Sequence, residues 1–173
     1  MIYSSAEHAV QASLFIKATP IGVSNPTGMV IDSLRRLFDV DYVRKAASGW
    51  TQHDWHANAV MILSRCEKAL GKHSLGWSAI LVRYGDPFDD DVKMAAALLA
   101  DGIVSKFEQH ISEKLIWNIQ TKRPSLREVA GWYPVNFSQL QRERAALNRK
   151  LHEIESAAWC ALNELNFDDW CYE

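Results

Sequence analysis

RPSLREVAGWYPVNFSQLQRERAALNRKL, residues 123–151, is the stretch of sequence that most strongly determines the predicted fold. Ser125 and the glutamate three residues later form a capping box, which predicts a short helix over 126–132. Pro134 ends this helix, because it cannot continue the helical hydrogen bonds and disfavours helical backbone in the preceding residue. An asparagine acceptor then precedes a much longer helix, predicted over 137–165. Two helices joined by about four residues follow the plan of a helix-turn-helix.

The predicted second helix has two different faces. At about 100° per residue, Leu147 and Leu151 fall within about 20° of Leu140, so these leucines mark the buried side. Small, hydroxyl and arginine side chains fall within about 40° of the opposite direction: Ser138, Arg142, Ala145 and Arg149. In a helix-turn-helix, the second helix presents such an exposed stripe to the major groove of DNA. A plain helical hairpin is the alternative interpretation, because the turn lacks a glycine and Arg144 falls near the buried side.

The residue types on and beside this stripe suit two kinds of DNA contact. Arginine pairs bidentately with guanine, and serine and glutamine also bond base edges. The candidate base contacts are Ser138, Gln139, Arg142 and Arg149. Cations at the entry helix and at the end of the stripe suit the phosphate backbone. The candidate phosphate contacts are Lys122, Arg123, Arg127 and Lys150.

The distribution of charge agrees with an anionic partner. The chain of 173 residues has a formal net charge of −2, but residues 122–150 carry seven lysines and arginines against two acids, a balance of +5. Residues 1–121 balance at −1 and residues 151–173 at −6. A local basic block in a mildly acidic protein favours an anionic partner, with a solvated helix face as the alternative.

The rest of the chain also has the pattern of helices. Ser4-x-x-Glu7 and Thr51-x-x-Asp54 resemble capping boxes, and apolar residues recur at steps of three and four. No segment alternates apolar and polar residues for long enough to predict a sheet. The helices predicted before the basic block cover 5–17, 28–47, 52–71, 74–84, 90–110 and 112–121. The predicted fold class is therefore all-α.

Two domains are expected: a helical bundle over 1–121, and a helix-turn-helix with a long terminal helix over 122–173 that packs on the bundle. The terminal helix carries an apolar seam at heptad spacing: Leu147, Leu151, Ile154, Ala158, Ala161 and Leu165. This seam either packs on the chain's own bundle or pairs with a second copy. Pairing would give a homodimer, as symmetric DNA sites require.

Other candidate chemistry has weaker support. His53 and His56 could share one helix face and bind a metal, but no ligand pair of structural zinc sites accompanies them. Asp89–Asp91 could hold Mg²⁺, although acids are also typical of a first helical turn. No phosphate loop, nucleophile elbow or HExxH motif is present. We therefore expect no enzyme activity, no metal and no cofactor.

The sequence also bears on the compartment. Cys66, Cys160 and Cys171 are odd in number, which argues against a disulfide framework. No apolar run is long enough to span a bilayer, and no secretory leader opens the chain. These features predict a cytoplasmic protein without a membrane partner.

The layout resembles a family of small phage and prophage late-gene regulators, of the Q-type antitermination and RinA/ArpU kind. The resemblance lies in the SLREVA helix, the turn and the basic helix that continues into Leu147-x-x-x-Leu151-x-x-Ile154-Glu155. The TQHDWHANAVMI stretch, residues 51–62, is also similar to prophage proteins of this group. Trp132-Tyr133-Pro134 departs from the small residues usual in the turn.

The resemblance implies a sigma-factor-like helix-turn-helix whose turn and second helix contact DNA, at Ser138, Gln139, Arg142 and Arg149. It also implies a role in transcription control, with double-stranded DNA as the partner and RNA polymerase as a candidate second partner. The alternative from a different functional class is a non-enzymatic adaptor or structural protein. Such a protein would hold protein partners on its apolar and tryptophan-rich faces.

Overall fold

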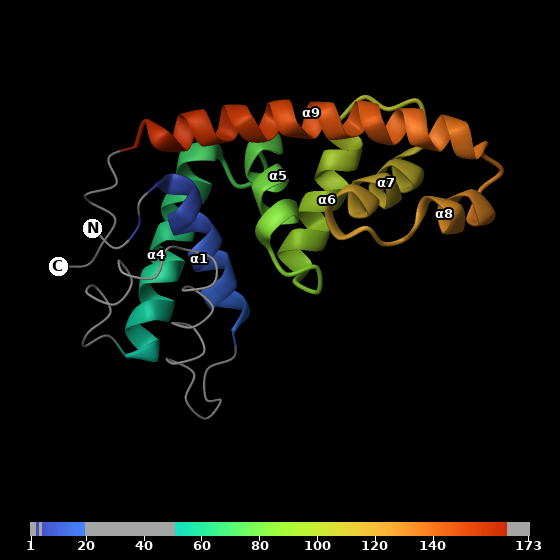
Figure 1. Ribbon diagram of the computed structural model, residues 1–173. Helices are drawn as coiled ribbons and strands as arrows, with labels where there is room; N and C mark the ends of the chain where they lie inside the picture. The colour runs from blue at the N-terminus through green and yellow to red at the C-terminus, as the bar shows by residue number, and fades with distance from the viewer. Residues whose placement is uncertain (1–2, 4, 20–50, 166–173) are drawn as a thin grey trace. The chain divides into compact units, whose positions relative to one another are not determined.

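The computed structural model describes residues 3, 5–19 and 51–165 of the chain. Seven α-helices and no β-strand occur in these residues, which confirms the predicted all-α fold class (Figure 1). The helix predicted over 28–47 lies outside the described residues.

The chain divides into two compact units, which are described separately. The first unit comprises Met1–Gly71, Tyr84–Asp86 and Trp159–Glu173. The second comprises Lys72–Arg83 and Pro87–Ala158. The expected domain boundary after residue 121 stays a prediction, because these units reflect packing and not independent folding.

The first unit is built on helix α1, Ala6–Ala18, which packs against helix α4, Gln52–Leu70. The cap of α1 is Ser5, whose hydroxyl accepts from the amide of His8, one residue later than the predicted cap at Ser4. At α4 the predicted capping box of Thr51 and the aspartate three residues later is present. Apolar residues at steps of three and four form the buried face of α4, with Trp55 at 1% exposure.

The remaining helices have the bounds α5 Leu75–Tyr84, α6 Asp90–Gly102, α7 Gln109–Thr121, α8 Leu126–Trp132 and α9 Phe137–Asn163. They lie in the second unit, except for the last residue of α5 and the part of α9 after Ala158, which belong to the first. Helix α7 packs against both α6 and α8. One apolar cluster joins these helices, and α9 contributes Leu140, Leu147 and Leu151 to it. This shared core holds α8 and the first part of α9 on a helical base (Figure 1).

The predicted boundary between the helices over 90–110 and 112–121 is wrong, because α6 ends at Gly102 and α7 begins at Gln109, with a loop between them. Helix α6 ends at Gly102, where an added Cβ would lie 2.5 Å from a methyl carbon of Leu75. In the following loop, the hydroxyl of Ser105 and the amide of Lys106 both donate to the carboxylate of Glu143 in α9. These bonds take the place of the backbone hydrogen bonds that would continue α6. The contact with Glu143, which is distant in sequence, therefore ends the helix. The aspartates at 89–91 do form the start of α6.

The apolar seam of α9 is covered by the chain itself. Leu147, Leu151 and Ala158 are almost completely buried, whereas Ala161 is exposed and Leu162 is buried in its place. The buried stripe thus advances by four residues after Ala158, as a straight helix of 3.6 residues per turn requires over a long distance. A homodimer stays a prediction, and it would need a surface other than the buried leucines.

Candidate nucleic-acid interface

Helix α8 begins and ends where the sequence predicts. The hydroxyl of Ser125 accepts from the amide of Glu128 at 3.3 Å, and the Glu128 carboxylate accepts from the Ser125 amide at 2.7 Å. These bonds from Ser125 hold the pKa of Glu128 below its ordinary value. The helix ends before Tyr133, whose backbone is extended (φ −125°, ψ 146°), as the following proline favours. Four residues, 133–136, then lead into α9.

The turn is anchored by an aromatic contact that explains its unusual composition. Tyr133 is half-buried, and its ring lies 4.9 Å from the ring of His110 in α7, centroid to centroid. Val135 also packs against the apolar cluster. Trp132, by contrast, is 56% exposed. The side chains of the turn therefore fix its position on α7 without a glycine.

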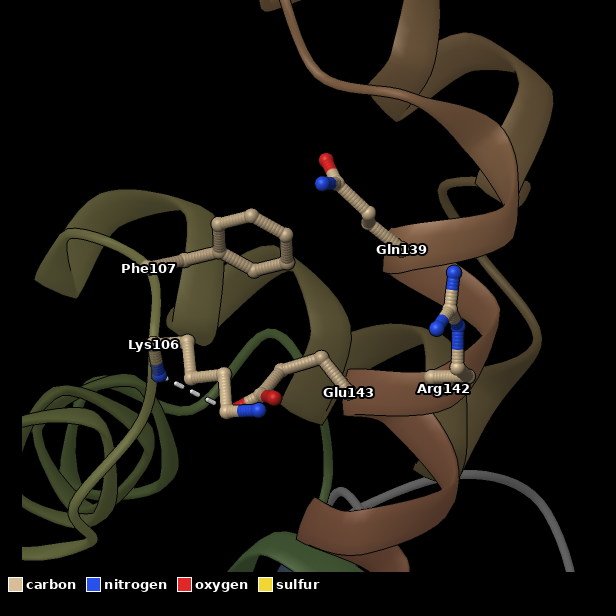
Figure 2. Close-up of a pocket in the computed structure, with 5 residues that line it drawn as sticks. All are labelled: Lys106, Phe107, Gln139, Arg142 and Glu143. Carbon is tan, nitrogen blue, oxygen red and sulfur yellow. Dashed lines mark hydrogen bonds between the residues drawn. The ribbon is translucent and has the colours of Figure 1, made fainter.

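Asn136 caps the start of α9 through its side-chain oxygen. This oxygen accepts from the amide of Ser138 at 2.9 Å and from the Ser138 hydroxyl at 2.8 Å. Gln139, three residues later, makes no capping-box bond back to Asn136 among the residues that the structure describes. The side chain of Gln139 instead projects from α9 toward Phe107 (Figure 2).

The two predicted faces of α9 are confirmed by burial. Leu140 has 0% exposure and lies in the apolar cluster of the second unit. The candidate base contacts are all exposed: Ser138, Gln139, Arg142 and Arg149. Arg142 lies along the helix surface, because its Nε donates to the carbonyl of Ser138 at 3.3 Å. The structure therefore brings these four side chains to one accessible face.

The candidate phosphate contacts differ in their surroundings. Arg123 and Arg127 are exposed. Lys122 adopts a left-handed backbone (φ 63°) at the end of α7, and its ammonium donates to the carbonyl of Ile119 at 3.1 Å. Lys150 is half-buried, and its ammonium donates to the carbonyl of Val104. The two lysines thus also hold backbone in place, whereas the two arginines extend from the surface.

Arg144 has a structural role that the sequence did not reveal. It is half-buried, and its Nε donates to the side-chain oxygen of Asn118 in α7. The amide nitrogen of Asn118 in turn donates to the carbonyl of Pro124 at 2.8 Å, just before α8. This chain of bonds joins α9, α7 and the entry to α8. It accounts for an arginine near the buried side, which had favoured a plain hairpin.

The acidic residues of the basic block are both engaged in the fold. Glu143 is 8% exposed, and one oxygen accepts from the Ser105 hydroxyl at 3.0 Å and the Lys106 amide at 2.9 Å. Glu128 is committed to the cap of α8. Glu143 has no motif in the sequence that marks it as a structural acceptor. Its position three residues after Leu140, about 60° from the buried direction, was the available signal.

A recess of about 300 Å³ lies beside the exposed face of α9 (Figure 2). Lys106 and Phe107 line it from the loop after α6, and Gln139, Arg142 and Glu143 line it from α9. Two candidate base contacts therefore share a concave surface with loop residues distant in the sequence. The sequence offered no signal for this surface, because the region was predicted to be helix.

The histidines at the start of α4 do not gather further ligands in the described part of the chain. His53 is exposed and His56 half-buried, and no group of three potential metal ligands occurs there. Burial, followed by the charge of His53, lowers the pKa of His56. Further along the same helix, burial raises the pKa of Cys66 to about 12.

Comparisons with known proteins assign no family to the chain. No protein-family model matches it, and no curated protein is found as a relative. The resemblance to phage late-gene regulators therefore stays a hypothesis. Within residues 3, 5–19 and 51–165, no helix is long and apolar enough to cross a membrane.

Proposed function

We propose that α8, the connecting turn and the first half of α9 form a helix-turn-helix that binds double-stranded DNA, in a non-enzymatic transcription regulator of phage or prophage type. One observation carries the proposal. The exposed face of α9 presents serine, glutamine and two arginines, while the leucines of its opposite face are buried in the core. A rigid helix with this composition suits insertion into the major groove.

The proposal assigns base edges and phosphates to different residues. Arg142 lies in the second turn of α9, close to the end that enters the groove in helix-turn-helix proteins, and would contact guanine. Ser138 retains its oxygen lone pairs as acceptors, because its hydroxyl donates to Asn136. Arg123 and Arg127, at the entry to α8, would contact the flanking phosphates.

Electrostatics support the same assignment. Residues 122–150 carry a balance of +5, and both acids included in it accept hydrogen bonds within the fold. Glu143 is 8% exposed, and the carboxylate of Glu128 accepts from the Ser125 amide at the amino end of its own helix. Exposed cations beside a helix attract the phosphate backbone over about one Debye length, so association should weaken with salt.

The experiment measures binding of the full chain to duplexes selected from a random pool, by fluorescence anisotropy across a salt series. Replacing Arg142 with alanine should cost about 1–3 kcal/mol on the selected site and reduce the preference for it. Replacing Arg127 with alanine should weaken all duplexes alike and lower the salt slope by about one. Lys68→Ala removes an exposed cation of α4 and serves as the matched control.

The two variants distinguish a contact with base edges, at Arg142, from a contact with the phosphate backbone, at Arg127. Loss of preference with Arg142→Ala, together with a smaller salt slope for Arg127→Ala, would support the proposal. If no duplex shows salt-sensitive affinity, the basic block is a solvated face and the proposal fails. The homodimer and the contact with RNA polymerase stay predictions in either case.

A helical adaptor is the second candidate function, and two side chains beside the turn favour it. Trp132 is 56% exposed and Phe137 is 38% exposed, although both are large and apolar. Exposed aromatic residues are enriched among those that dominate protein interfaces. Absence of DNA binding, together with capture of a protein partner that is lost in Trp132→Ala, would favour this function.

A further inference from the structure

The recess between the loop after α6 and helix α9 carries three residues that the proposed function does not use: Lys106, Phe107 and Glu143. Its volume of about 300 Å³ lies at the lower end of the range for small-molecule sites. Its lining combines two cations, one aromatic ring, one amide and one carboxylate. This combination is unusual for a groove that contacts phosphates alone, because a carboxylate repels them.

The carboxylate of Glu143 is the distinctive group of the recess. The residue is 8% exposed, and Figure 2 shows its side chain extending from α9 toward the loop. One oxygen accepts both loop bonds. Among the residues that the structure describes, the other oxygen has no hydrogen-bond partner. Because Glu143 lines the recess, this oxygen is open to it and can accept hydrogen bonds from a ligand that donates them.

The remaining residues define the rest of the ligand. Phe107 is half-buried, and its ring and the amide of Gln139 point toward one another across the recess (Figure 2). An aromatic ring in this position offers a stacking surface for a flat ligand. Lys106 and Arg142 are exposed and supply cations for an anionic group. The ligand is therefore flat, donates hydrogen bonds at one edge and carries a negative charge.

We propose that this recess binds one guanine nucleotide unit. Its base would stack on Phe107, its adjacent N–H donors would bond the free oxygen of Glu143, and its phosphate would lie beside Lys106 and Arg142. Adenine fits less well, because a ring acceptor beside its amino group would face the carboxylate. The unit is either a free nucleotide or an unpaired guanine of a single strand, since stacking and edge recognition need an unstacked base.

One consequence rests on the proposed function. Gln139 and Arg142 line the recess and are also candidate base contacts of the duplex. Occupation of the recess and insertion of α9 into a major groove therefore exclude one another. A guanine nucleotide would then lower the affinity for duplex DNA by competition.

The experiment is calorimetric titration of the full chain with guanosine monophosphate, adenosine monophosphate, guanosine, inorganic phosphate and an oligothymidylate containing one guanine. We expect guanosine monophosphate to bind about fivefold or more tightly than adenosine monophosphate, the lower limit for one good edge contact. Phe107→Ala should weaken binding about fivefold or more. Glu143→Gln keeps an oxygen for the loop bonds and should abolish the preference for guanine. Lys106→Ala tests the cation beside the phosphate, and Lys68→Ala, which removes an exposed lysine of α4, is its control.

The outcomes separate the site from the proposed function. The inference is supported if guanosine monophosphate or the guanine-containing strand binds, and if this binding is sensitive to Phe107→Ala and Glu143→Gln. Whichever of the two binds shows whether the ligand is a free nucleotide or an unpaired guanine of a single strand. The inference fails if none of the ligands binds, or if guanine and adenine nucleotides bind equally to wild type and Glu143→Gln. Circular dichroism confirms that each variant is folded. Nucleotide binding without duplex binding would overturn the proposed function and leave the recess assigned.

Discussion

The two faces of the first half of α9 belong to one helix but meet different surroundings. On one face, Leu140, Leu147 and Leu151 are 0%, 1% and 3% exposed. On the other face, Arg142 and Arg149 are exposed. Burial of the leucines stabilises the position of the helix, and the arginines are consequently presented in a fixed direction. Substitutions on one face should therefore change stability, and those on the other should change binding.

The two glutamates of the basic block also differ in their surroundings, because Glu143 is buried and Glu128 is exposed. Glu143 is on the side of α9 that packs on the loop after α6. Its carboxylate accepts the hydrogen bond of the Lys106 amide, which a backbone carbonyl would accept in a helix. Glu128 is exposed, and its bonds are made within its own helix turn. Solvent can replace the partners of Glu128 easily and those of Glu143 only after the loop opens. Three predictions test this division.

The largest effect is expected on the buried face. Leu140→Ala should lower the free energy of unfolding by about 2–5 kcal/mol, because it removes apolar contacts and leaves a cavity in the core. Urea unfolding followed by circular dichroism measures this change. Arg142→Ala is the matched control on the exposed face and should remain within about 0.5 kcal/mol of wild type. Equal losses in the two variants would contradict the division between faces.

An intermediate effect is expected at Glu143. Replacing it with alanine should cost about 1–3 kcal/mol, because the amide of Lys106 and the hydroxyl of Ser105 lose their acceptor. Hydrogen exchange at the Lys106 amide should become faster. Glu143→Gln retains an acceptor oxygen and should protect this amide better than alanine does. Unchanged exchange in Glu143→Ala would show that the loop is held without the carboxylate.

The smallest effect concerns Glu128 and pH. Hydrogen bonds from Ser125 hold its pKa below the ordinary value of 4.5 in the folded protein. Its contribution to stability is therefore present above pH 4.5 and is lost as the pH falls through the lower, folded pKa. The difference in melting temperature between wild type and Glu128→Gln should be small near neutral pH and should shrink in acid.

A second capping box provides a check on that prediction. Asp54 of α4 has a pKa lowered in the same sense, chiefly by bonds from Thr51. Asp54→Asn should therefore show the same sign of pH dependence as Glu128→Gln. A difference between wild type and Glu128→Gln that grows as the pH falls would contradict the proposed role of the carboxylate.

The bounds of α8 and the two faces of α9 could be predicted from the sequence. Ser125, Glu128 and Pro134 act within one or two helical turns, so their effects do not depend on the rest of the molecule. Leu140 and Leu147 mark the buried face because helical periodicity is a local property. The exposed position of Arg142 follows from the same geometry. These features include the candidate base contacts, though not the partner that they bind.

The tertiary structure alone determined what lies beside this face. Helix α6 ends at Gly102, which lies beside Leu75 of α5, and the loop that follows is held by Glu143. The partners of these residues lie dozens of positions away in sequence, and no local pattern of spacing identifies them. The position of Arg144 on Asn118 depends on the same kind of distant contact. Local propensity and periodicity therefore determined the helices, whereas long-range packing and hydrogen bonding decided the loop, the recess and the orientation of the exposed stripe.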